Sequence, residues 1–214
     1  MKQLILILLT VFIGQLQTNA QLAVGIEPFF RNSTDRVGST YGAGICVDFK
    51  EDNVIFRSGF SMTVPRIFSG TATINAFDSA TIPYHIYVPI EQKVTDYILH
   101  IGGGAIINPK MDENYFVATF GVRGILRSLN IKYLNSFDKN TYDDKYSDRQ
   151  PYIPASLNLG FNLGIGYWCK YKHLILFPNI SLGFGSGDNR NKHPWNDFPT
   201  YLELGCRILI TSNN

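Results

Sequence analysis

The sequence predicts an all-β protein, a single antiparallel up-and-down transmembrane β-barrel, from three observations. An export signal opens the chain, and Ser156–Trp168 (SLNLGFNLGIGYW) carries an apolar side chain at every second position. Similar alternating segments recur along most of the remaining chain, often with Gly, Ser, Thr or Asn in between. Successive side chains of a strand point to opposite faces. Each segment therefore has one apolar face, suited to lipid, and one polar or small face, suited to a lumen.

Residues 1–20 have the organisation of a secretory signal peptide. Lys2 supplies a positive charge, Leu4–Ile13 is an apolar run, and Ala20 is a small residue suited to cleavage. The apolar run is shorter than the roughly 20 residues of a spanning helix, which disfavours an N-terminal membrane anchor. We therefore expect residues 1–20 to be removed and the barrel domain to occupy residues 21–214.

Ten segments carry the alternation, so we predict about ten strands, with eight as the alternative. In chain order, the predicted strands are Leu22–Phe30, Tyr41–Phe49, Val54–Val64, Ile82–Val94, Tyr97–Ile107, Tyr115–Leu126, Leu129–Leu134, Ser156–Trp168, His173–Gly185 and Thr200–Ile210. The apolar faces that identify them, in the same order, include Val24 and Ile26; Ile45 and Val47; Phe60 and Met62; Val88 and Ile90; Leu99 and Ile101; Phe116 and Phe120; Ile131 and Tyr133; Phe161 and Leu163; Leu176 and Ile180; and Leu204 and Ile208.

The connections between these strands alternate in length. The predicted short turns are Lys50–Asn53, a bend near Thr95-Asp96, a bend near Arg127-Ser128, and Cys169–Lys172. The predicted longer loops are Arg31–Thr40, Pro65–Thr81, Asn108–Asn114, Asn135–Tyr152 and Ser186–Pro199. Short turns on one side and long loops on the other are typical of bacterial transmembrane barrels. The bend at Arg127-Ser128 has the weakest support, because it would set Arg123 opposite Lys132.

Nine charged side chains fall on the faces predicted to point into the lumen. They are Glu27, Asp48, Arg57, Glu91, Lys93, Arg123, Lys132, Glu203 and Arg207. Charges withdrawn from bulk water must be paired or hydrated, and small barrels are commonly filled by their own side chains. We therefore expect a salt-bridged network that plugs a narrow lumen, with Asp48–Arg57 and Glu203–Arg207 as its first pairs. The alternative is a polar, ion-conducting pore.

The remaining reactive residues form no recognisable active site. The histidines are His85, His100, His173 and His193, and the cysteines are Cys46, Cys169 and Cys206. Their spacing matches no catalytic, zinc or disulfide pattern. We therefore predict no enzymatic activity, no catalytic residue, no metal site, no cofactor and no stable disulfide. The formal net charge of +2 gives no indication of nucleic-acid binding.

Two of the predicted loops combine charged and aromatic side chains. Loop 135–152 contains three tyrosines, and loop 186–199 contains Trp195 and Phe198. Exposed aromatic side chains anchor many protein interfaces, but they also occur beside lipid at membrane interfaces. We favour the second interpretation, and keep a protein partner at loops 135–152 and 186–199 as a further hypothesis.

The signal peptide, Ser156–Trp168, the segment VPIEQKV (88–94) and the closing strand YLELGCRILI (201–210) resemble the small outer-membrane β-barrel proteins of Gram-negative bacteria, a porin-like family. The resemblance covers essentially Gln21–Ile210. It implies a location in the outer membrane, surrounded by outer-membrane lipid, after export across the inner membrane. The expected function is an integral barrel of structural, adhesive or assembly type with a charge-plugged lumen. A narrow porin-like channel for ions or small solutes is the alternative, and a soluble, secreted, lipocalin-like ligand-binding barrel is the second alternative.

Overall fold

The computed structural model describes residues 21–34, 37–107, 114–150, 155–185 and 200–211. The predicted signal peptide and the whole of the predicted loop 186–199 lie outside these residues. The described part of the chain is built from β-strands, and it contains no helix long and apolar enough to cross a membrane. Its eleven strands are β1 (Gln21–Ile26), β2 (Phe29–Ser33), β3 (Thr40–Glu51), β4 (Val54–Thr63), β5 (Arg66–Ala76), β6 (His85–Ile106), β7 (Asn114–Tyr133), β8 (Tyr142–Gln150), β9 (Ser156–Tyr171), β10 (Leu174–Gly185) and β11 (Thr200–Thr211).

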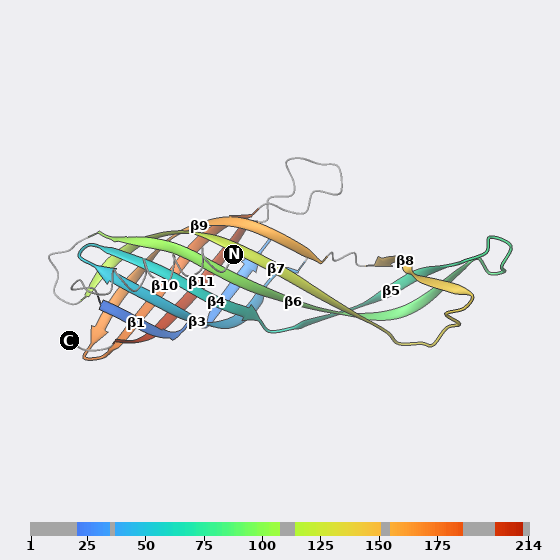
Figure 1. Ribbon diagram of the computed structural model, residues 1–214, viewed down its shortest axis with the longest axis horizontal. Helices are drawn as coiled ribbons and strands as arrows, with labels where there is room; N and C mark the ends of the chain where they lie inside the picture. Colours follow the sequence, from blue (N-terminus) through green and yellow to red (C-terminus); the bar gives the residue numbers. More distant parts are fainter. Residues whose placement is uncertain (1–20, 35–36, 108–113, 151–154, 186–199, 212–214) are drawn as a thin grey trace, which may run out of the picture.

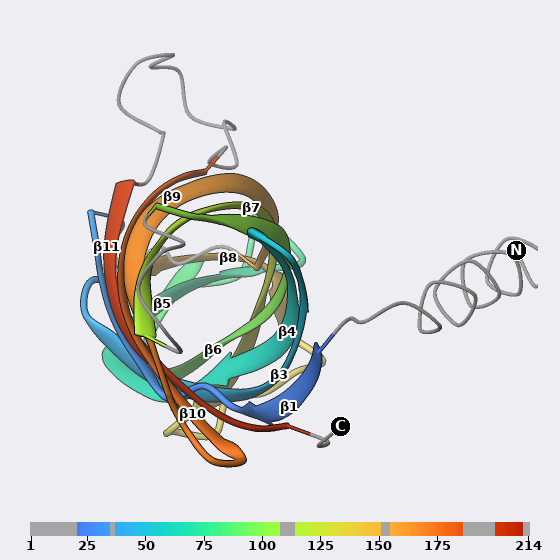
Figure 2. The same cartoon turned by 90° about the vertical axis from the view of Figure 1, so that its left-hand side faces the viewer.

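The strands close into an antiparallel barrel, which confirms the predicted fold class. Strands β1 and β2 share one position in the ring, because both pair with β3 on one side and β11 on the other. From there the ring continues β3-β4-β6-β7-β9-β10-β11. Within the described residues the barrel therefore has eight strand positions, the alternative count, and Figure 2 looks along its axis.

Two of the predicted turns are wrong. Strands β6 and β7 each run without interruption through the positions where bends were expected, near Thr95-Asp96 and Arg127-Ser128. Asp96 is in fact the register partner of Arg127, in the middle of one continuous ladder. The polar residues interrupt the apolar pattern but not the hydrogen bonding between the strands. Ile107 and Asn114, which border the predicted loop Asn108–Asn114, consequently lie at the same end as the short turns.

That end of the barrel, the turn end, has tight connections at residues 52–53 and 172–173. Asp52 and Lys172 adopt the left-handed conformation there, with φ of 48° and 55°. Such φ values suit a two-residue hairpin turn, whose twist matches that of the strands it joins. The first strand and the last strand also meet at this end, where Ala23 pairs with Thr211. The opposite end is called the mouth.

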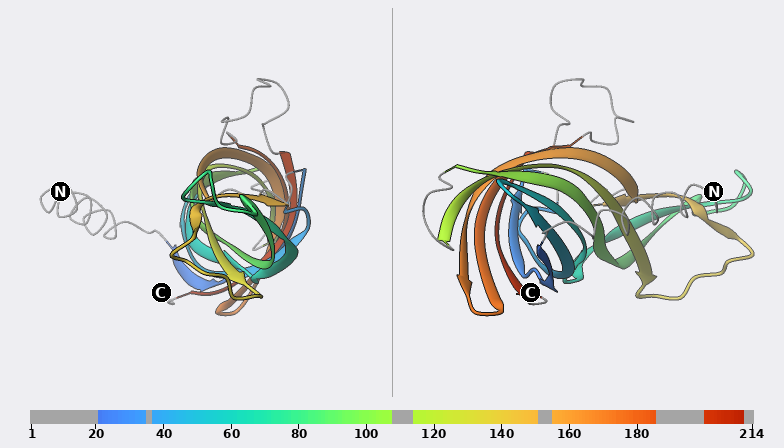
Figure 3. Two further views of the ribbon diagram at one scale, coloured as in Figure 1. Left: turned by 90° about the vertical axis from the view of Figure 1, so that its right-hand side faces the viewer. Right: turned by 60° about the vertical axis from the view of Figure 1, so that its left-hand side comes forward.

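Beyond the mouth, four strand segments of the same sheet project from the barrel and form the extension (Figures 1 and 3). It consists of β5, residues 85–95 of β6, residues 128–133 of β7, and β8, in the order β7-β6-β5-β8. Strand β6 is 22 residues long, about twice the roughly 9–11 residues of a membrane-spanning strand. Strands β5 and β8 lie within segments predicted as loops, Pro65–Thr81 and Asn135–Tyr152.

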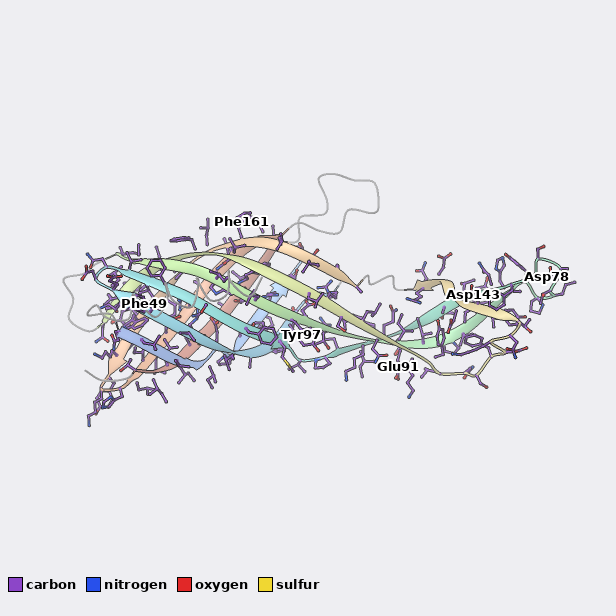
Figure 4. The ribbon with its side chains drawn as sticks, viewed as in Figure 1. Phe49, Asp78, Glu91, Tyr97, Asp143 and Phe161 are labelled. Carbon is purple, nitrogen blue, oxygen red and sulfur yellow. The ribbon has the colours of Figure 1, made fainter. Side chains whose placement is uncertain are left out.

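The extension has a small core of its own, formed by buried Ala72, Ile74, Val88 and Ile90. On the barrel, by contrast, the alternating apolar side chains that identified the strands face outward. Leu159, Phe161 and Leu163 are each at least 60% exposed, and Figure 4 shows Phe161 pointing away from the barrel. The same alternation therefore faces inward in the extension and outward in the barrel, as expected if water surrounds the extension and lipid surrounds the barrel.

Candidate functional site

The barrel interior is filled by three successive groups of side chains, and the first is apolar. At the turn end, buried Ile55, Val117, Trp168, Phe177 and Leu209 converge as a core cluster. The rings of Trp168 and Phe177 lie 6.1 Å apart, and Trp168 stacks on Tyr115 at 5.9 Å. These positions alternate with lipid-facing ones, so each strand of this region contributes to both the cluster and the outer surface.

The second group is a network of charges, the inner cluster, directly above the apolar group. Asp48 accepts a hydrogen bond from the Nε of Arg57 at 3.3 Å and another from the Nη1 of Arg207. The Nε of Arg207 also donates to Glu27 at 3.0 Å, and its Nη2 lies 3.2 Å from His100 Nδ1. The Arg57 guanidinium lies 4.0 Å from the centre of the Phe177 ring, which joins the two groups. Two carboxylates thus face two guanidinium groups.

The third group, the outer cluster, lies closer to the mouth. Glu203 accepts hydrogen bonds from Arg31 at 2.8 and 3.0 Å and from Arg123 at 2.6 Å at each of its two oxygens. All three side chains are at most 7% exposed. The ring of Tyr201 lies beneath both cations, 4.6 Å from Arg31 and 5.5 Å from Arg123. One carboxylate therefore serves two guanidinium groups in this cluster.

At the mouth, Arg127 binds Asp96 through Nε at 2.8 Å and Nη2 at 3.0 Å. This pair and Arg31 line a small cavity of about 30 Å³, together with Thr40, Asn158 and Tyr201. The cavity lies where the extension leaves the barrel, because Asp96 and Arg127 are the last residues of β6 and β7 on the barrel side. Thr63 Oγ1 accepts a hydrogen bond from the backbone amide of Asp96 at 2.9 Å and fixes this corner.

The structure places six of the nine predicted lumen residues in these clusters and three outside the barrel. Glu27, Asp48, Arg57, Arg123, Glu203 and Arg207 belong to the clusters just described. Of the two pairs expected first, Asp48 meets Arg57, whereas Glu203 and Arg207 contact different partners.

Glu91, Lys93 and Lys132 lie on the extension, and Figure 4 shows Glu91 where the strands have just left the barrel. Their assignment to the lumen is wrong, because the strands that carry them leave the membrane. In the extension the apolar face of the sheet is buried, so the charged face points into water. Lys93 and Lys132 are accordingly exposed. Glu91 is the register partner of Lys132 there.

Sequence reasoning missed Arg31, Asp96 and Arg127. Each has the spacing of the inward-facing residues of a predicted strand but lies just outside its predicted bounds. Arg31 follows Glu27 and Phe29, Arg127 follows Arg123, and Asp96 precedes the strand Tyr97–Ile107. Continuing the alternation past the first polar residue would have found all three. The cysteines are free in the structure, with Cys46 buried, and Cys169 lies in β9 and not in a turn.

A barrel with paired charges inside and apolar side chains outside is suited to a lipid bilayer and not to water. Because the barrel is closed, it leaves no strand edge with unpaired backbone groups in the lipid. Comparison with solved structures agrees. A major outer membrane protein from Thermus thermophilus matches with a TM-score of 0.55 at 13% identity, over 91% of this chain and 100% of that chain. The chain has the fold of an outer-membrane β-barrel protein. Because apolar side chains point outward, the alternative of a soluble lipocalin-like barrel is wrong.

Two further solved outer-membrane barrels also match. Neisserial surface protein A aligns at 10% identity with a TM-score of 0.44, over 90% of this chain and 99% of that chain. Ail, the attachment invasion locus protein of Yersinia pestis, aligns at 11% identity with a TM-score of 0.44, over 89% and 97%. No protein-family model matches the sequence, and no curated protein matches it. In barrels of this kind the short turns face the periplasm, so the mouth and the extension face the outside of the cell.

Proposed function

We propose that this protein is a plugged outer-membrane barrel of adhesive type, which holds a recognition sheet outside the cell. The observation that carries the proposal is the extension. It is a four-stranded sheet with a buried core, continuous with β6 and β7 of the barrel. A sheet that is rooted in a membrane barrel by two unbroken strands is held at a fixed distance and angle from the membrane. Such rigidity lowers the entropic cost of binding a partner, because the sheet is already ordered.

The barrel interior supports a plug and not a channel. Trp168, Phe177 and their neighbours fill the turn end, and the ion pairs of the inner and outer clusters fill the rest. Wide aqueous channels are typical of barrels with many more strands. In the described part of the chain both oxygens of Asp48 and of Glu203 accept hydrogen bonds from guanidinium groups, which leaves these carboxylates poorly suited to acid–base catalysis. We therefore also propose that the protein is not an enzyme.

The surface of the extension supports recognition of a protein. Ile67, Phe77 and Tyr87 are more than 60% exposed there, and Ile82 at the tip is 94% exposed. These side chains lie outside the lipid, where exposed apolar groups are typical of protein-binding sites. Strand β8, from the predicted partner loop 135–152, pairs only with β5 among the described strands and adds an edge for strand pairing. Loop 186–199 is the second segment at which we expect a protein partner to bind.

A trimmed barrel tests this function. The backbone amide of Asp96 bonds the hydroxyl of Thr63, and Arg127 is the register partner of Ser156. Residues 64–95 and residues 128–155 can therefore each be replaced by a two-residue Asn-Gly turn that leaves the eight barrel positions intact. Bacteria displaying the intact chain should adhere to protein-coated surfaces and cultured cells, and bacteria displaying the trimmed barrel should not.

Conductance supplies the second measurement. We expect the intact protein to produce no steady current in a planar bilayer. Equal adhesion by intact and trimmed barrels, both correctly inserted, would contradict the recognition role. A stable conductance of the intact protein would replace the plug with the narrow-channel alternative.

A further inference from the structure

The outward face of β6 and β7 continues without a break from the barrel into the extension. Each strand is uninterrupted over this distance, and Tyr97 pairs with Leu126 at the last apolar rung of the face. Figure 4 shows Tyr97 at the rim of the barrel and Glu91 on the same strand where the extension has begun. The surface that contacts lipid on the barrel is therefore continuous with the base of the extension.

Aromatic side chains mark the level at which this face leaves the hydrocarbon. Tyr97 stacks on Phe60 of β4 with 6.5 Å between the ring centres, and the rings of Phe30 and Tyr41 on the neighbouring strands lie 5.0 Å apart. Phe60 and Tyr41 are exposed. Exposed aromatic rings are enriched where transmembrane barrels meet the membrane–water interface. These rings therefore place the outer boundary of the hydrocarbon near Tyr97.

Above Tyr97 the outward face becomes polar in steps. The next rung holds Thr95 and Ser128, and the rung after it holds Lys93 and Asn130. Counted from the turn end, Lys93 is the first charged residue at an outward position of β6. At about 3.3 Å per residue it lies about 13 Å along the strand from Tyr97, or about 10 Å in height for a typical strand tilt. A headgroup layer is about 5–8 Å deep, so a long lysine side chain reaches into it.

Two lysines give this face its cations at the level of the headgroups. Lys93 and Lys132 are both exposed, and they lie on adjacent strands one rung apart. Lys132 is the register partner of Glu91, whereas the register partners of Lys93 are uncharged, Asn130 on β7 and Ile67 on β5. Lys93 is therefore the cation better placed to meet a negative group outside the protein.

Apolar side chains lie beside Lys93 at the same level. Ile67 is 64% exposed, and Val64, in the connection from β4 to β5, is 60% exposed. From the barrel outward, the face thus presents apolar groups, then hydroxyls, then a cation with apolar neighbours. An anionic lipid has the complementary order, since its acyl chains lead through a polar linkage to a phosphate.

We propose that the base of the extension binds the headgroup phosphate of an anionic lipid in the outer leaflet. Lys93 supplies the principal charge, the hydroxyl of Ser128 donates a hydrogen bond below it, and the acyl chains lie along Tyr97 and Leu126. Basic side chains next to a membrane surface attract anionic headgroups, which gives this arrangement its affinity. The site does not depend on the adhesive role, because it uses only the membrane-proximal face of the extension.

Lipid binding by the unaltered protein tests the site. Native mass spectrometry of the intact protein in non-ionic detergent counts the lipids that it retains, with diphosphoryl lipid A and fully dephosphorylated lipid A as the two probes. Because the phosphates supply the charge, we expect the diphosphoryl form to bind more tightly by about fivefold or more. Equal affinities for the two probes would overturn the proposal. Displacement of the lipid by an equal concentration of inorganic phosphate would also overturn it, since the site would then need no membrane.

Two matched variants locate the bound lipid. Lys93→Gln removes the charge from an exposed position, and it should weaken binding of diphosphoryl lipid A by about fivefold, the contribution of one lysine near a membrane surface. Lys139→Gln is the control, because it removes the same charge from the connection between β7 and β8, where Lys139 is 72% exposed and pairs with Asp144. It should leave the affinity unchanged. An unchanged affinity in Lys93→Gln, or equal losses in both variants, would overturn the proposal.

Discussion

Asp96 and Arg127 form a two-point ion pair across β6 and β7 at the level where the barrel becomes the extension. Both side chains are at most 9% exposed, and the amide of Asp96 is tied to Thr63 on β4. The pair therefore fixes the geometry between the membrane part and the external sheet. The pair therefore braces β6 and β7 against each other where they pass from the barrel into the extension.

Replacing Asp96 should measure the strength of this link. Asp96→Ala removes the carboxylate that Arg127 binds at two points, and we expect the free energy of unfolding to fall by roughly 3 kcal/mol. Lys139→Ala is the control, because Lys139 is 72% exposed in its pair with Asp144 and should cost only about 0–1 kcal/mol. Urea unfolding in lipid vesicles measures both. Equal losses for the two variants would show that the mouth pair is hydrated.

The faces of the barrel strands follow from the sequence, because a period of two fixes which side chains share a face. Phe161 points outward and Asp48 inward as predicted. The register does not follow so simply. Four-residue turns were expected at 50–53 and 169–172, but both turns contain two residues, at 52–53 and 172–173, which moves the first pairing by two positions and the second by four. A shift of two keeps the faces and changes the partners, so Asp48 lies directly opposite Arg57 and not opposite Ile55.

The extension could not be predicted from alternation alone. A strand that leaves the membrane keeps its pattern, and only the solvent around it changes. Val88 and Ile90 have the same spacing as Leu159 and Phe161, but the first pair is buried and the second exposed. The polar residues Thr95 and Asp96 mark the crossing from lipid to water, and in the sequence such a crossing resembles a turn.

The outward face of β9 can be tested with a charge. Phe161→Arg should lower the free energy of unfolding by about 2–4 kcal/mol, because it places a cation in the apolar band of the bilayer. Tyr87→Arg is the matched control, since Tyr87 is 73% exposed on the extension, and surface substitutions there should change stability by about 0.5 kcal/mol or less. Reversible urea unfolding in phospholipid vesicles gives both values. A similar loss of unfolding free energy at both positions would show that the membrane boundary assigned between barrel and extension is wrong.

Closure of the barrel depends on Gly25 in β1. A Cβ atom at this position would overlap the backbone carbonyl oxygen of Ile208 on β11, which cannot move without breaking the ladder. We expect Gly25→Ala to lower the free energy of unfolding by about 1–3 kcal/mol or more. At Gly124, where the nearest atom to a Cβ would be Leu159 Cδ2 at 3.9 Å, Ala should be neutral or slightly stabilising. Unfolding in detergent compares the two, and equal stability of both variants would contradict tight closure at β1.

The plug depends most on Asp48, which joins Arg57 and Arg207 in the inner cluster. Asp48→Ala leaves Arg57 buried without a carboxylate, and we expect a loss of about 3–5 kcal/mol in the free energy of unfolding. Adding Arg57→Ala should recover part of this loss, because the double variant no longer holds the stranded cation. Urea unfolding and single-channel recording are made on the same preparations. A nearly neutral Asp48→Ala together with a conducting parent would mean that water fills the inner cluster, since hydrated ion pairs contribute only about 0–1 kcal/mol.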